Sequence, residues 1–167
     1  NAEIMSNPLK ITSNPTFDNY VTAFNTMNYP SALLNTILIS VVSVVLIIIT
    51  SAMTAYFVAR SHTKTGKVIF YFLVASMMIP FQAVMIPLVT IYGNLGLLNS
   101  RLTLIYLYVG FGCGMGMFIF HGFINSSIPL SLEEAAMIDG AGLLQTFFWI
   151  VFPLLKPVIA TLAVLDV

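Results

Sequence analysis

Long apolar runs alternate with short polar segments along this chain. The first apolar run covers residues 32–59, the second 68–92 and the third 102–124, and a fourth covers 154–167. A helix that crosses the hydrocarbon core of a membrane needs about 20 apolar residues. The pattern therefore predicts an all-α membrane protein, a polytopic helical bundle that is represented here by three complete spans and the start of a fourth.

The scarcity of charge supports this interpretation. The chain has 167 residues, six Lys and Arg against six Asp and Glu, a net charge of zero and only 7% charged residues. Soluble domains carry about 25%, so a soluble globular enzyme is the interpretation that the composition favours least. No basic run could follow a phosphate backbone, so we expect no nucleic-acid partner. A single cysteine cannot form an internal disulfide, and no Cys/His cluster has metal-site spacing.

The basic residues predict the orientation of the spans. Residues 60–67 carry three of the six basic side chains, and short loops rich in Lys and Arg face the cytoplasm. Because successive spans cross in opposite directions, residues 1–31 and 93–101 are then expected outside and residues 125–153 inside. The predicted organisation is thus an extracytoplasmic segment over 1–31 and a transmembrane domain over 32–167.

The extracytoplasmic segment has a different composition from the rest. It is rich in Pro, Asn, Ser and Thr with isolated aromatic residues, which fits either an ordered segment with a short helix near residues 17–24 or a loose linker. The chain begins without Met and stops inside an apolar run. We therefore expect it to be the middle of a longer protein.

The inner loop, residues 125–153, holds the most informative pattern. Ser131 and Glu134 have the spacing of a capping box, which predicts a short helix over 132–139. Gly140 follows where a helix C-terminus favours a left-handed residue. A second helix, carrying several apolar and aromatic side chains, is then expected to continue until a proline stops it.

Small side chains on the first of these helices would allow another surface to approach closely. They belong to a fixed pattern that resembles the EAA loop of ABC importer permeases, E-A-A-x3-G-x9-I-x-L-P. The matching positions here are Glu134, Ala135, Ala136, Gly140, Ile150, Phe152 and Pro153. Only Phe152 departs from the pattern, and it replaces one apolar residue with another.

The extended stretch 133–141 resembles the carbohydrate branch of that family, in particular the second permease of maltose-type importers. Weaker similarities follow in order along most of the chain, at Asn35–Thr36, Ala55–Tyr56, Ala59–Arg60, Pro80, Ile86–Leu88 and Gly96–Ser100. The resemblance implies a MetI-like permease fold that forms the pathway for a sugar or sugar-like solute in a bacterial or archaeal cytoplasmic membrane.

The same resemblance implies partners. The first loop helix would dock on cytoplasmic ABC ATPase subunits, and a second homologous permease and an extracytoplasmic solute-binding protein would complete the importer. The positions implied in the ATPase contact are Glu133, Glu134, Ala135, Ala136, Asp139, Gly140 and Pro153. The chain has no phosphate-binding motif G-x-x-x-x-G-K-[ST], so we expect no catalytic site and no cofactor on it, with ATP bound by the partners.

Three positions are weak candidates for lining the substrate pathway. Gly112 and Gly114 belong to overlapping G-x-x-x-G patterns, which indicate either close helix packing, the favoured interpretation, or a pliable segment beside the pathway. Gln82 lies between Pro80 and Pro87. Its amide could face the pathway or bond to another helix, and the prolines predict kinks.

Two other classes of function compete with a permease subunit. A secondary transporter normally carries ionisable residues within its spans, and among His, Asp, Glu, Lys and Arg the three complete spans contain only His121. An intramembrane enzyme needs a nucleophile and a base at depth, and no such arrangement is visible. Arg60, Lys64 and Lys67 are interpreted most simply as determinants of orientation.

The predicted orientation can be tested by labelling. In the full-length protein, a Thr65→Cys variant should resist an impermeant thiol reagent in intact cells, because residues 60–67 are assigned to the cytoplasm. An Asn99→Cys variant should react. The opposite labelling pattern would invert the topology.

Overall fold

The computed structural model describes residues 16–166, so the predictions for residues 1–15 lie outside the described residues. The chain divides into two units, Asn1–Leu38 and Ile39–Val167. In the first unit, α2 (Asp18–Thr26) confirms the short helix expected near residues 17–24. Met27 ends it, and its backbone N–H bonds the Ala23 carbonyl at 2.9 Å.

The described part of the chain is helical and contains no strand. The remaining elements are α3 (Tyr29–Arg60), α4 (Lys64–Met77), α5 (Phe81–Asn94), α6 (Arg101–Ser127), α7 (Leu130–Ile138), α8 (Leu143–Thr146), the π-helical turn η1 (Phe147–Val151), α9 (Phe152–Leu154) and α10 (Lys156–Leu165). The all-α prediction is confirmed.

Two helices, α3 and α6, are long and apolar enough to cross a membrane, and each of two bent pairs could supply one more span. They match the runs predicted over 32–59 and 102–124. In the second unit α3 buries side chains spaced three and four residues apart, from Ser43 to Val58. This spacing puts one helix face against the core and leaves the other available to lipid.

The run over 68–92 is not the single continuous helix that its hydrophobicity suggested. It forms α4 and α5, which meet at a bend of 95°. Pro80 precedes α5 in an extended conformation (φ −68°, ψ 139°) and supplies no backbone N–H. The kink expected at Pro80 is therefore confirmed as a complete break, whereas α5 continues through Pro87.

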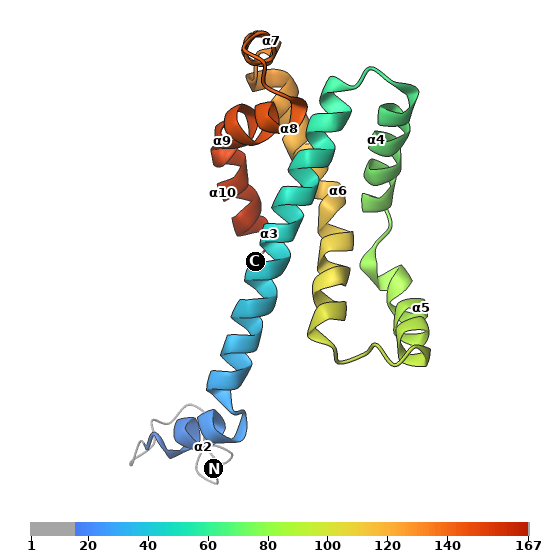
Figure 1. Ribbon diagram of the computed structural model, residues 1–167. Helices are drawn as coiled ribbons and strands as arrows, with labels where there is room; N and C mark the ends of the chain where they lie inside the picture. Colours follow the sequence, from blue (N-terminus) through green and yellow to red (C-terminus); the bar gives the residue numbers. More distant parts are fainter. Residues whose placement is uncertain (1–15, 167) are drawn as a thin grey trace, which may run out of the picture. The chain divides into compact units, whose positions relative to one another are not determined.

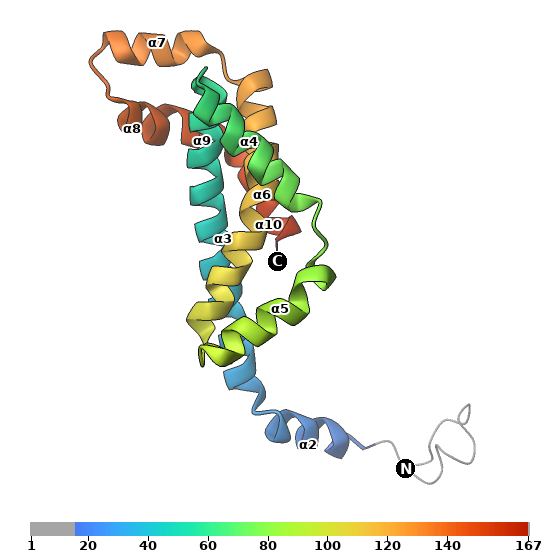
Figure 2. The same ribbon diagram turned by 90° about the vertical axis from the view of Figure 1, so that its right-hand side faces the viewer.

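Successive loops of unit 2 lie at opposite ends of the unit, as expected for a chain that crosses back and forth. Figures 1 and 2 show α4 running beside α6 from the end of the unit at which α3 finishes. The loop after α5 and the start of α6 lie at the opposite end. The bent pair thus carries the chain back along the unit before α6 returns.

Glycines on α6 bring the helices of unit 2 together. A methyl group on Gly112 would lie 2.6 Å from Cδ1 of Ile47, and one on Gly116 would lie 2.6 Å from Oγ of Ser51. Gly114 faces the other way, where a methyl group would lie 3.1 Å from the Leu73 carbonyl of α4. The prediction of close helix packing is confirmed, because α3 and α4 occupy the space that larger side chains would need.

The core lies between α3, α6 and the C-terminal helices. Ala52 and Ala55 of α3, Met117 and Phe120 of α6, and Leu155 beyond α9 are all fully buried. The small alanines let α3 approach, and the larger side chains fill the remaining space.

The chain after residue 142 differs from the expected helix ended by a proline. Pro153 lies within α9, which continues directly from the π-helical turn η1. The change of direction, a bend of 71°, comes between α9 and α10. The fourth apolar run therefore begins as α10, after Leu155, and Pro153 does not end the preceding helical segment.

The glycine contacts predict a difference between two variants of α6. Gly116→Ala should lower the thermal unfolding temperature of the purified full-length protein, because the new methyl group would collide with Ser51. Gly110→Ala is the control, since no atom lies within 4 Å of its added methyl group. Helix propensity favours alanine by about 1 kcal/mol, so this variant should be as stable as the wild type or more so. Equal destabilisation by both would contradict the packing.

Candidate functional site

The helix α7 is held between two backbone signals. Pro129 precedes it in an extended conformation (φ −64°, ψ 135°). Gly140 follows it with φ +89°, a conformation that L residues rarely adopt. The N–H of Ala141 then bonds the Ala136 carbonyl at 2.9 Å, as in a Schellman ending. The predicted left-handed glycine is confirmed.

The capping box predicted for this helix is wrong. The structure starts α7 at Leu130, with Pro129 at the N-cap and no side-chain hydrogen bond there. Ser131 therefore lies inside the first turn and not before it. A proline fixes φ and provides an extended residue ahead of the helix, which allows α7 to begin two residues earlier than expected.

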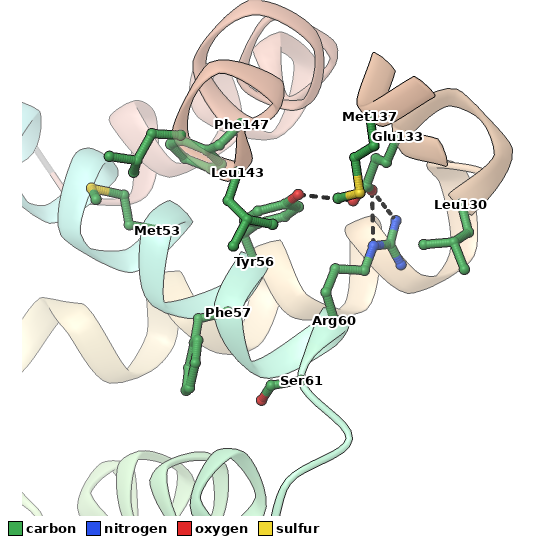
Figure 3. Close-up of a pocket in the computed structure, with 11 residues that line it drawn as sticks. Met53, Tyr56, Phe57, Arg60, Ser61, Leu130, Glu133, Met137, Leu143 and Phe147 are labelled. Carbon is green, nitrogen blue, oxygen red and sulfur yellow. Dashed lines mark hydrogen bonds and ion pairs between the residues drawn. The ribbon is translucent and has the colours of Figure 1, made fainter. Parts of the chain in front are cut away.

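A buried ion pair joins α7 to the end of α3. One carboxylate oxygen of Glu133 accepts a hydrogen bond from Nε of Arg60 at 2.8 Å. Nη2 of Arg60 lies 2.7 Å from the same oxygen and completes the ion pair. The other oxygen accepts from the Tyr56 hydroxyl at 2.9 Å. Arg60 also donates to the Ile128 carbonyl at the end of α6, at 2.9 Å. Figure 3 shows the contacts of Glu133 with Arg60 and Tyr56.

The burial of Glu133 makes this network important for the position of α7. Its exposed fraction is 1%, and a carboxylate removed from water is costly unless it is paired and hydrogen-bonded. The Tyr56 ring packs against that of Phe147, with centroids 5.3 Å apart. One side chain on α7 therefore connects α3, the end of α6 and, through Tyr56, the turn η1.

The ion pair borders an apolar cavity of about 550 Å³ at the same end of the unit. Figure 3 shows the lining side chains of α3, α7 and the α8 region facing one another. They are Met53, Tyr56, Phe57, Arg60, Ser61, Leu130, Glu133, Met137, Leu143, Leu144 and Phe147. The cavity belongs to this junction of helices and brings no further ionisable group to it.

The predicted ATPase-contact residues divide between two faces. Glu133 and Ala136 are buried inside the chain, and the assignment of all seven residues to an ATPase contact stays a prediction. The spacing of three residues between Glu133 and Ala136 puts them on the same face of α7. The exposed positions are Glu134, Ala135, Asp139, Gly140 and, on α9, Pro153.

Sequence reasoning missed the partners of Glu133. Arg60 was interpreted as a determinant of orientation, and Tyr56 only as part of a weak family similarity. A signal was present, because the two residues are four apart at the end of a span and thus share a helix face. Their pairing with Glu133, which lies 77 positions after Tyr56 and 73 after Arg60, depends on tertiary structure.

The three pathway candidates are not brought together. Gly112 packs on α3, Gly114 on α4, and Gln82 is exposed in the first turn of α5. Their assignment to a pathway stays a prediction. Within residues 16–166, no group of three or more His, Cys, Asp or Glu could hold a metal ion.

The arrangement is that of a polytopic helical membrane protein with a short helix fixed at one end of its bundle. Residues 51–167 match the family described as the binding-protein-dependent transport system inner membrane component. Because the match covers more than half of the chain, the chain belongs to that family of ABC importer permeases, which have the MetI-like fold.

Curated relatives agree with this assignment. The chain is 41% identical over 99% of its length to the probable starch degradation products transport system permease protein AmyC of Thermoanaerobacterium thermosulfurigenes. It is 38% identical over 90% of its length to the melibiose/raffinose/stachyose import permease protein MelC of Bacillus subtilis. The chain spans 60% and 54% of these relatives.

The adjacent glutamates of α7 provide a test of the ion pair. Glu133→Gln should destabilise the purified full-length protein by about 3–5 kcal/mol, because it leaves the Arg60 charge without its buried partner. Glu134→Gln is the matched control, since Glu134 is exposed, and should change stability by less than about 0.5 kcal/mol. Thermal unfolding monitored by circular dichroism would measure both. Equal stability of the two variants would contradict a structural role for the pair.

Proposed function

We propose that this chain is the transmembrane subunit of an ATP-driven importer and that α7 couples it to a cytoplasmic ATPase. The observation that carries the proposal is the opposite character of the two faces of α7. Glu133 and Ala136 fix its inner face, while Ile138 is 86% exposed and Ala135 is exposed beside it. An exposed apolar surface on a firmly held helix is suited to contact with another protein.

The position of α7 supports a role in transmitting movement. Figure 2 shows it lying across the end of unit 2 at which α3 and α6 finish. A displacement of α7 would act through Glu133 on Arg60 of α3 and on the end of α6. Closure of the ATPase subunits could thereby move the spanning helices as connected bodies, and ATP itself would bind only to those partners.

The proposed cargo is a neutral oligosaccharide. This rests on relatives whose names specify starch degradation products, melibiose, raffinose and stachyose, and diacetylchitobiose. The proposed assembly also contains a second homologous permease and an extracytoplasmic solute-binding protein, in the cytoplasmic membrane of a bacterium or archaeon. In this assembly the chain supplies a pathway and no catalytic group.

Substitutions on the two faces of α7 would test the ATPase contact. Ala135→Trp in the full-length importer should abolish co-purification of the ATPase subunits without blocking membrane insertion, because a bulky side chain would separate the surfaces. Ala23→Trp on the exposed α2 is the control and should leave the complex intact. Retention of the ATPase and normal uptake by Ala135→Trp would refute the docking surface.

Ala136→Trp gives a different expectation. Because Ala136 is only 7% exposed within its own chain, a tryptophan there should lower the stability of the permease before any partner binds. Ala135 is therefore the more informative position at which to test the ATPase contact. Thermal unfolding of the isolated permease would separate the two effects.

A further inference from the structure

A small polar cavity lies in unit 2, away from the α7 junction. Its volume is about 250 Å³, and its lining residues are Ser40, Ser43, Ile47, Tyr108 and Asp166. Four of these five side chains carry a hydroxyl or a carboxylate. Three helices supply them, namely α3, α6 and the C-terminal end of α10.

Two polar atoms in this cavity are buried without a hydrogen-bond partner among the described residues. They are Oγ of Ser43 and Oδ2 of Asp166. Ser43 is 2% exposed, so water reaches it poorly from outside. A buried donor or acceptor normally has a partner, and an orphaned one indicates that something else bonds to it.

Ser43 contrasts with other hydroxyl side chains on the same helix. Thr54 donates to the Thr50 carbonyl at 2.8 Å, one turn earlier. Ser51, which is 1% exposed, donates to the Cys113 carbonyl of α6 at 3.3 Å. A hydroxyl on α3 can therefore find a partner within the helix or across the packing interface. Ser43 instead lines the cavity beside Asp166.

The cavity lies far from both ends of α3. Ser43 comes fourteen residues after Tyr29 and seventeen before Arg60, which corresponds to about 21 Å and about 26 Å along the helix. This is near the middle of a hydrocarbon core of about 30 Å. Asp166 lies in the fourth apolar run, 154–167, and adds a carboxylate to the membrane-embedded region beyond the His121 of the three complete spans. Ionisable residues at such depth are costly, and they mark substrate or ion pathways.

We propose that Ser40, Ser43, Tyr108 and Asp166 form a subsite that binds hydroxyl groups of a neutral sugar during its passage. The carboxylate accepts hydrogen bonds from sugar hydroxyls, and the serine and tyrosine hydroxyls can both donate and accept. No basic side chain lines the cavity, so an anionic solute would be repelled by Asp166. This inference rests on the proposed function, because it requires that the chain transports a sugar.

The test uses the full-length importer reconstituted with its ATPase, second permease and binding protein. Radiolabelled maltotriose, raffinose and diacetylchitobiose are the probes, and the sugar taken up by the wild type is used for the variants. Asp166→Asn should lower the number of sugars taken up per ATP hydrolysed by about tenfold, because a neutral amide oxygen accepts weaker hydrogen bonds than a carboxylate does. Ser43→Ala should lower this ratio in the same direction, by a smaller factor.

Ser51→Ala is the matched control, because it removes an equally buried hydroxyl that already has a partner. It should lower the thermal unfolding temperature and leave the sugar-to-ATP ratio unchanged. Ser43→Ala should not lower the unfolding temperature of the sugar-free complex, since its hydroxyl has no protein partner to lose. A fall as large as that of Ser51→Ala would show that another part of the permease bonds Ser43, and would refute the subsite.

The remaining outcomes distinguish a failure of the subsite from a failure of the proposed oligosaccharide function. Uptake and hydrolysis that fall together in Asp166→Asn would make Asp166 structural and overturn the inference. Uptake that requires Na⁺ in the wild type, but not in Asp166→Asn, would assign the cavity to a cation instead. A wild-type complex that takes up none of the three sugars would count against the proposed oligosaccharide function itself. Wild-type uptake with unaffected Asp166 and Ser43 variants would refute only the subsite.

Discussion

The buried ion pair between Arg60 and Glu133 is the interaction on which the arrangement around α7 depends. It joins residues 73 positions apart, and Arg60 also holds the Ile128 carbonyl. Removing one partner would leave a charge in a poorly solvated place, at a cost of about 3–5 kcal/mol. Breaking the pair is therefore costly, and the pair holds α7 at the end of α3.

Backbone constraints give that ion pair its geometry. Pro129 starts α7 and Gly140, at φ +89°, ends it. Between them, three-residue spacing directs Glu133 and Ala136 inward. The exposed side of the same turns is left apolar at Ile138, which is 86% exposed. One short helix thus combines an internal anchor with a surface that another protein can contact.

Much of the fold could be predicted because membrane-spanning helices have a distinctive hydrophobicity pattern in the sequence. Apolar runs located α3 and α6, since a spanning segment must be long and nearly free of charge. Glycines on α6 predicted close packing, which Gly116 confirms against Ser51. The bend at Pro80 was expected only as a kink, because hydrophobicity does not report the angle between two helices.

The sequence by itself determined the class of protein, the main helices and the left-handed turn at Gly140, because these depend on composition and on residues near one another in the chain. Tertiary structure alone decided that Glu133 faces inward to Arg60 and that Asp166 and Ser43 line the same cavity. Both arrangements join segments far apart in sequence. No local pattern encodes them, because they arise from how the helices pack and from which polar groups that packing encloses.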